Sequence, residues 1–278
     1  MQNQQISSFF ANNGYAVARN LFSLDEVQGL REHFMKLRAA GPLPYDLAAD
    51  TPQSQDPLKK YPRMLNMHRL DKTSRNWLLE PRILDLLHLF FDAEPLACQS
   101  MVYFKPPGAR GQALHQDNYY LRVRPGTCIA AWMALDDSDE ANGCMQVVPG
   151  SHTWDTLCAQ KADITKSFTD VTVPIPAGYH PIPIIMKAGD VLFFNGSIVH
   201  GSLPNITADR FRRSLIGHYV CTRTEYLTKY DQPVLNRKGE ELTLNASEEG
   251  GPCGIWVDET GTPVIELSGQ LAATNITE

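Results

Sequence analysis

The sequence LHQD at 114–117 decides the fold when it is taken together with GDVLFFNGSIVHGS at 189–202. Residues two apart on a β-strand point to the same side, so His115 and Asp117 are expected to act together. Two imidazoles and one carboxylate can occupy one face of a six-coordinate ferrous ion, which leaves three adjacent positions for a co-substrate and dioxygen. The pattern therefore predicts a non-haem iron site, with His200 supplied by a distant strand of the same barrel.

An arginine-rich segment follows the distal histidine, with the sequence NITADRFRRSL at 205–215. A guanidinium is always charged and offers its donors in a fixed fork, which suits the distal carboxylate of 2-oxoglutarate. Arg212 is the predicted partner of that carboxylate, and Arg210 and Arg213 are the neighbouring alternatives. Arg213 would face the opposite side of a strand that carries Arg212.

Two other functions compete with an iron oxygenase. A bare H-x-D is common in proteins, so the barrel could bind a small molecule without catalysing its conversion. A zinc hydrolase also uses two histidines and one carboxylate, but the sequence contains no H-E-x-x-H motif that would place a base beside the metal.

Several motifs occur in an order that resembles the phytanoyl-CoA dioxygenase family of iron(II)- and 2-oxoglutarate-dependent oxygenases. The resemblance covers residues 8–222 and is carried by the following segments: KPPG at 105–108, LHQD at 114–117, AWMALDD at 131–137, NGCMQVVPGSH at 142–152 and the segment around His200. It implies a mainly β protein with flanking helices, built on a double-stranded β-helix (a jelly-roll, cupin-like barrel). It also implies Fe(II) as cofactor, with 2-oxoglutarate and dioxygen as co-substrates.

The same resemblance assigns further roles around the iron. Family members that halogenate replace the carboxylate ligand with a small residue, so Asp117 implies hydroxylation or a related oxidation. The family pattern favours Arg212 over its neighbours for 2-oxoglutarate. Ser202, Trp132 and Gln99 occupy positions from which relatives contact the same co-substrate, although a turn serine and a core tryptophan are ordinary structural alternatives.

The substrate is predicted only by class, as a small anionic or zwitterionic metabolite rather than an acyl-CoA. Asn118 and Tyr119 follow the carboxylate ligand, Tyr103 lies on the predicted inward face of its strand, and Arg63 belongs to a basic group; these four are the candidate substrate contacts. Two long irregular stretches, at 41–67 and 154–183, are expected to cover the barrel mouth, since long loops in compact domains are usually functional or disordered.

The chain of 278 residues is predicted to form a single domain. Helices are expected within 1–95, the barrel within 96–225 and an extension over 226–278. A capping box at 23–26 predicts a helix that ends near Gly41, and Pro81 predicts the start of another. The expected strands lie at 98–105, 127–135, 144–148, 191–194 and 214–221.

Composition narrows the remaining possibilities. The net charge is −6 and no basic cluster indicates nucleic acid. No apolar stretch is long enough to cross a bilayer, and the first residues lack a secretory signal, so a cytoplasmic protein without membrane partners is expected. The six cysteines show no C-x-x-C spacing and are predicted to be scattered, reduced thiols. His152 is predicted to be structural.

Overall fold

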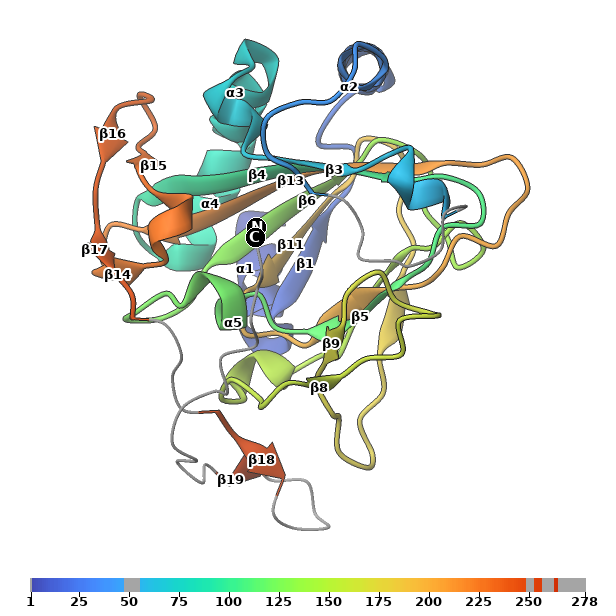
Figure 1. Ribbon diagram of the computed structural model, residues 1–278. Helices are drawn as coiled ribbons and strands as arrows, with labels where there is room; N and C mark the ends of the chain where they lie inside the picture. Colours follow the sequence, from blue (N-terminus) through green and yellow to red (C-terminus); the bar gives the residue numbers. More distant parts are fainter. Residues whose placement is uncertain (1, 48–55, 249–252, 257–262, 265–278) are drawn as a thin grey trace.

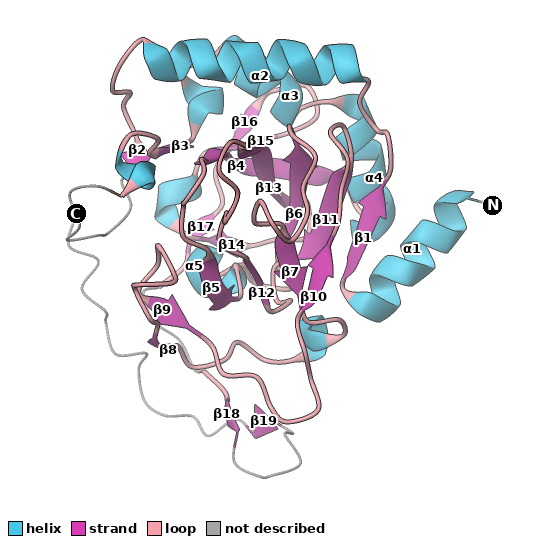
Figure 2. Cartoon of the chain, turned by 90° about the vertical axis from the view of Figure 1, so that its right-hand side faces the viewer, coloured by secondary structure: helices cyan, strands magenta, loops and turns pink. Residues whose placement is uncertain are grey.

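Two antiparallel sheets lie face to face in the computed structural model, which describes residues 2–47, 56–248, 253–256 and 263–264. Helices α2 (Leu24–Ala39) and α3 (Lys72–Leu78) lie over the outer side of the larger sheet, and the smaller sheet lies on its other side (Figure 1, Figure 2). The predicted mainly β architecture with flanking helices is confirmed.

The larger sheet has nine strands, and its main path runs β1-β11-β6-β13-β4-β15-β16, while β3 joins β4 and β2 to it. These strands are β1 (Tyr15–Ala18), β2 (Asp46–Leu47), β3 (Arg63–Leu65), β4 (Pro95–Lys105), β6 (Ile129–Ala134), β11 (Val191–Asn195), β13 (Arg212–Cys221), β15 (Val234–Leu235) and β16 (Glu241–Leu242). The long pair β4 and β13 holds Lys105 opposite Arg212 and Gln99 opposite His218.

The smaller sheet has four strands in the order β10-β7-β12-β5. They are β5 (Gln112–His115), β7 (Met145–Val147), β10 (Ile182–Ile184) and β12 (His200–Ser202). Short strand pairs complete the structure: β8 (Gln160–Lys161) with β9 (Val171–Thr172), β14 (Tyr226–Leu227) with β17 (Asn245–Ala246), and β18 (Ile255–Trp256) with β19 (Pro263–Val264).

Alternation along the central strands separates two hydrophobic cores. On β6, Ala131 and Met133 pack in the core beneath the helices, whereas Trp132 packs in the core between the two sheets. On β13, Leu215 joins the helix-side core and Ile216 the inner one. Even-numbered residues of β13 up to 218 therefore face the barrel interior, which is the face that carries the site.

The helices bury their apolar sides against the larger sheet. The remaining helices are α1 (Gln2–Asn13), α4 (Pro81–Phe91) and the single turn α5 (Asn118–Leu121). The predicted capping box of α2 is present, with the Ser23 and Glu26 side chains each bonded to the other's backbone. Pro81 is in the first turn of α4, as predicted, and each fully buried leucine of this helix stabilises the fold by about 1.5–3 kcal/mol.

The strands expected from sequence are confirmed to within three residues at each end. Those that the pattern missed are short or lie at an edge, such as β1, β5, β10 and β12. The segment after the barrel is part of the fold, because Leu227 and Val234 pack in a common core with Leu121 and Val220. The predicted extension beyond Val264 lies outside the described residues.

One cysteine prediction is wrong. Cys158 and Cys253 form a disulfide, whereas Cys98, Cys128, Cys144 and Cys221 are free and buried. The two bonded cysteines lie 95 residues apart in the sequence, and tertiary packing brings their segments together, with Cys158 donating its backbone N–H to Gly254. None of the helices in the described ranges combines the length and apolar character that a membrane crossing requires.

Candidate metal centre and co-substrate pocket

The three predicted metal ligands come together inside the barrel. His115 ends β5 and His200 begins β12, and the antiparallel register places them directly opposite each other. The Nε2 atoms of His115 and His200 lie 3.5 and 3.6 Å from the same oxygen, Oδ1 of Asp117. One ligand atom from each residue lies within 4.8 Å of the other two, and all three side chains are buried.

The position of Asp117 does not result from the alternation of side chains along a strand. β5 ends at His115, and Asp117 has helical backbone angles (φ −64°, ψ −32°) at the start of α5. Backbone N–H groups of Tyr120 and Leu121 donate to the Asp117 carbonyl, so a helical turn directs the carboxylate back toward the histidines. The three side chains come together as the sequence predicts, but the expectation that His115 and Asp117 share one strand was wrong.

Each histidine is oriented by its other ring nitrogen. Nδ1 of His115 lies 2.9 Å from the Ala113 carbonyl, and Nδ1 of His200 lies 3.1 Å from the Ile198 carbonyl. A protonated Nδ1 donates to each carbonyl and leaves Nε2 unprotonated, which is the form that binds a metal. Burial lowers the pKa of His200 to about 4 despite the nearby carboxylate, so this imidazole is neutral at physiological pH.

The carboxylate is ionised under the same conditions. Burial alone would raise the pKa of Asp117, but its interactions with His200, His218 and His115, including hydrogen bonds from His115 and His218, outweigh burial and hold that pKa well below its usual value. Two imidazoles and one carboxylate, clustered in a buried pocket, fit a divalent iron and leave coordination positions open. No other group of this kind occurs among the described residues.

Two buried cations lie beside the triad. Lys105 and Arg212 face each other across β4 and β13, and each is only 2% exposed. Burial lowers the pKa of Arg212 to about 10, and burial together with Arg212 holds the pKa of Lys105 well below its usual value. Neither forms an ion pair with a carboxylate in the part of the chain that the structure describes. Buried charges of this kind are costly unless an anion compensates them.

The predicted co-substrate residues surround these cations. Lys105 Nζ donates to Ser202 Oγ at 2.8 Å, and the Arg212 guanidinium carbon lies 5.3 Å from the centre of the Trp132 ring. Arg212 Nε donates to the Gly143 carbonyl at 3.1 Å. Arg213 points to the other side and pairs with Asp136 at 2.7 Å, as strand alternation predicted. Sequence reasoning gave Lys105 no role, although it begins the KPPG motif.

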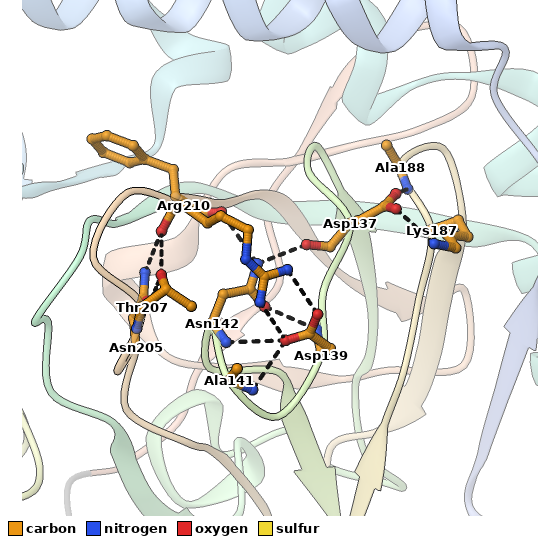
Figure 3. A network of polar contacts seen from close by, with 10 residues as sticks. Asp137, Asp139, Ala141, Asn142, Lys187, Ala188, Asn205, Thr207 and Arg210 are labelled. Carbon is orange, nitrogen blue, oxygen red and sulfur yellow. Dashed lines mark hydrogen bonds and ion pairs between the residues drawn. The ribbon is translucent and has the colours of Figure 1, made fainter.

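A network of loop residues surrounds Asn142, the residue before Gly143 in the chain (Figure 3). Asn142 donates to the carbonyls of Asp137 and Phe211 and accepts from the Asp139 backbone N–H, while Arg210 forms a two-bond ion pair with Asp139. Gly143 has a φ of +89°, and a Cβ there would lie 2.7 Å from Cδ of Lys105. The Asn-Gly pair therefore sets the loop conformation next to both buried cations.

Gln99 lies on the inward face of β4, but its amide is engaged elsewhere. Its Nε2 donates to Asp231 at 2.7 Å, and its Oε1 has no hydrogen-bond partner among the described residues. Its contact with 2-oxoglutarate stays a prediction. His152 does not belong to the ligand group: it packs beside Gly14, and its Nε2 lies 3.1 Å from the Ala11 carbonyl, which agrees with the predicted structural role.

The candidate substrate contacts divide into two groups. Tyr103 and Arg63 meet: the guanidinium carbon lies 5.6 Å from the Tyr103 ring centre and 5.1 Å from that of Phe168. Asn118 instead accepts a hydrogen bond from the Val123 backbone, which closes the turn after α5, and Tyr119 packs edge-on against Tyr120. These observations do not test a contact of Asn118 or Tyr119 with substrate.

Tyr120, which the sequence analysis did not single out, lies beside one of the triad histidines. Its ring centre lies 6.1 Å from that of His115, and burial and the charge of Asp117 raise its pKa. His218 was also missed, although its Nε2 lies 3.0 Å from Asp117 Oδ2. The available signal was its even-numbered position on the strand that carries Arg212.

Comparison with known proteins agrees with this geometry. The phytanoyl-CoA dioxygenase family model matches residues 10–214. The chain belongs to the phytanoyl-CoA dioxygenase family. It is 26% identical to peroxisomal phytanoyl-CoA dioxygenase from Homo sapiens over 233 residues, covering 79% of this chain and 68% of that protein. It is 29% identical to phytanoyl-CoA dioxygenase 1 from Oryza sativa subsp. japonica over 157 residues, which is 56% of the length of each protein.

Solved structures share the fold. The epimerase SnoN in complex with Fe3+, alpha ketoglutarate and nogalamycin RO has a TM-score of 0.66 at 20% identity, covering 81% of this chain and 85% of that one. EctD from S. alaskensis with 2-oxoglutarate and 5-hydroxyectoine has a TM-score of 0.59 at 24% identity, covering 78% and 75%. The predicted double-stranded β-helix, the family and the class of enzyme, a 2-oxoglutarate-dependent oxygenase, are confirmed.

Proposed function

We propose that the protein is an iron(II)- and 2-oxoglutarate-dependent hydroxylase of a small anionic metabolite, with His115, Asp117 and His200 as the metal ligands. The observation that carries this proposal is the convergence of the three ligand atoms within 4.8 Å, beside two buried cations without a carboxylate partner in the described structure. When bound, the metal supplies the activation of dioxygen and the oxidation of an unactivated C–H bond.

Different groups of the protein orient the metal ligands and bind the co-substrate. The carbonyls of Ala113 and Ile198 orient the two imidazoles. Arg212 and Lys105, with the Ser202 hydroxyl, bind the distal carboxylate of 2-oxoglutarate, and Trp132 forms the wall of the same pocket. Holding both ends of the keto acid fixes its orientation, which is the main contribution that a protein makes to such a reaction.

Arg63 supports an anionic substrate. It forms no ion pair in the described structure, and its contacts are the Tyr103 hydroxyl at 3.4 Å and the faces of two aromatic rings. It lines a cavity together with Tyr61, Tyr103, Lys105 and Phe168. An arginine held by aromatic rings and without a carboxylate partner is well placed to bind a carboxylate, phosphate or phosphonate.

The loops around this cavity support a covering role. Arg63 belongs to the stretch 41–67 and Phe168 to the stretch 154–183, so both predicted lid segments contribute to one cavity wall. The cavity includes Lys105 but none of the three proposed metal ligands, so it adjoins the co-substrate pocket through this lysine. A cytoplasmic location remains a prediction from the sequence, and the Cys158–Cys253 disulfide is the observation that argues against it.

Oxygen-dependent formation of succinate from 2-oxoglutarate, with Fe(II) and a panel of small carboxylates, phosphates and phosphonates, tests the proposal. We expect a subset of these anions to stimulate succinate release and to gain one oxygen atom. Absence of succinate release with every compound, in protein that binds neither Fe(II) nor 2-oxoglutarate, would instead support a non-catalytic binding barrel.

Arg63→Gln sharpens the substrate assignment. For a stimulating anion, we expect its KM to rise roughly 10-fold or more while the 2-oxoglutarate KM is unchanged, because only the substrate loses a charged partner. Arg69→Gln is the matched control, since Arg69 lies in the next turn of chain but bonds to the Gln232 carbonyl. Equal KM values in the two variants would place the substrate anion elsewhere.

A further inference from the structure

The two oxygens of Asp117 have different partners. Oδ1 is the oxygen that lies 3.5 and 3.6 Å from the Nε2 atoms of His115 and His200. Oδ2 lies 3.0 Å from Nε2 of His218, which is 4% exposed and comes from the opposite sheet. The carboxylate is thus held between the proposed metal position and a buried histidine.

This division decides how many positions Asp117 takes on a metal. A carboxylate binds a metal through one oxygen or through both, and an oxygen that accepts a hydrogen bond from a fixed donor is held away from the metal. With one oxygen from Asp117, three positions of a six-coordinate ion stay open for a two-point keto acid and dioxygen. With both oxygens, only two positions would stay open, and the keto acid alone would fill them.

A second row of buried polar groups lies behind His218. Gln99 lies opposite His218 in the β4–β13 register, and its Nε2 donates to Asp231 at 2.7 Å. Asp231 is 5% exposed and belongs to the helical turn Lys229–Asp231, in the segment that follows the barrel. This segment packs through Leu227 and Val234 in the core that also contains Leu121, at the end of α5. Nδ1 of His218 has no hydrogen-bond partner among the described residues, so the His218 ring is held on its polar side by the bond of Nε2 to Asp117.

We infer that His218 is a positioning residue that keeps Asp117 as a one-oxygen ligand and so preserves the position that dioxygen needs. The inference rests on the proposed iron site and adds a function for a residue outside the ligand triad. His218 acts through Asp117, and nothing in the inference requires it to touch substrate or metal.

The test counts exchangeable water on a metal rather than activity. Mn(II) alone is bound to the protein to saturation, and the relaxation rate of water protons per bound Mn(II) is measured. His218→Leu removes the donor, frees Oδ2 for the metal and is expected to lower this rate by roughly one third, from three open positions to two. His218→Gln keeps an N–H donor near the position of Nε2 and is expected to match the wild type.

Controls separate this role from simple packing. His68→Leu removes another buried histidine, one that is 4% exposed and bonded to Ser100 instead of a ligand, and should leave the relaxation rate unchanged. If His218→Leu does not fold, His218→Asn replaces it, because the shorter amide does not reach Oδ2. Wild-type relaxation in the Leu or Asn variant, or the same decrease in the Gln variant, overturns the inference. Failure of the wild type to bind Mn(II) overturns the proposed metal site instead.

Discussion

Two polar regions on either side of β13 differ in whether their cationic side chains are paired with carboxylates. On the outer side, every cation of the loop network has an acid: Arg213 pairs with Asp136, Arg210 with Asp139 and Lys187 with Asp137. On the inner side, Lys105 and Arg212 are buried together without a carboxylate in the described structure. In the outer region the positive charges are compensated within the folded protein, whereas in the inner region their compensation requires a bound anion.

This difference indicates which region of the barrel binds a ligand. The Arg210–Asp139 and Lys187–Asp137 pairs are exposed and therefore contribute little to stability, so they mainly fix the shape of their loops. Two adjacent buried cations destabilise the folded state on their own, and a protein retains them where a bound anion compensates the cost. The following changes test this contrast, from the strongest expected effect to the weakest.

Asp117→Ala removes the anion of the triad and should reduce turnover at least about 1,000-fold, because the metal loses a ligand and its charge balance. His115→Ala should behave alike. Succinate release measures the effect, and circular dichroism should show an unchanged fold. Full activity in either variant would refute the ligand assignment.

Arg212→Ala and Arg213→Ala compare the two sides of one strand directly. Arg212→Ala should raise the KM for 2-oxoglutarate roughly 100-fold, because a buried charged contact with the co-substrate is lost. Arg213→Ala should leave that KM within about 2-fold and lower stability by about 1–3 kcal/mol, since it removes a largely buried, two-bond pair with Asp136. The reverse result would mean that Arg213, and not Arg212, contacts the co-substrate.

Lys105→Met tests whether the inner cations cost stability when no anion is bound. The 2-oxoglutarate KM should rise roughly 10-fold, while the unliganded protein should become about 1–3 kcal/mol more stable because an uncompensated buried ammonium is removed. Chemical denaturation without 2-oxoglutarate measures the second effect. A loss of stability in this variant would show that the lysine is not a cost to the unliganded fold.

The same lysine predicts a pH dependence. Burial and Arg212 lower the pKa of Lys105 in the folded protein, whereas the unfolded chain keeps its proton up to about pH 10.4. Between the folded and unfolded pKa values the unfolded state binds more protons, so the free energy of unfolding rises with pH in that window. This rise should be smaller in Lys105→Met, as measured by denaturation at a series of alkaline pH values.

Sequence reasoning found the site because few residue types can form it. Ligand chemistry indicated His115, Asp117 and His200, the family pattern favoured Arg212, and strand alternation then placed Arg213 on the opposite side of the strand. It did not find Lys105 or His218, because their roles depend on contacts with Ser202 and Asp117 across the barrel. Such contacts follow from the register of β4 against β13 and from the turn at Asp117, which are tertiary properties.

The disulfide was missed for a related reason. Cys158 and Cys253 lie far apart in sequence, and their spacing carries no signal about which segments pack together. The long barrel strands, by contrast, were predicted because a continuous run of apolar residues in the sequence indicates a buried strand. Short strands such as β12 contain too few residues to show such a run, even where they include a proposed metal ligand such as His200.

Arg210→Ala should have the smallest effect and completes the comparison. The ion pair with Asp139 has two good hydrogen bonds, but the side chains are 42% and 40% exposed, so its loss should cost less than about 1 kcal/mol. The 2-oxoglutarate KM should stay the same, because Asn142 still ties the loop to the carbonyls of Asp137 and Phe211 and so holds Gly143 against Arg212. Asn142→Ala is the matched change within the same network: it removes the side-chain donor to those two part-buried carbonyls, and should lower stability by about 1 kcal/mol or more and raise the KM as well. If Arg210→Ala raised the KM as much as Asn142→Ala, the outer ion pairs would be part of the co-substrate site, and the contrast between the two sides of β13 would not hold.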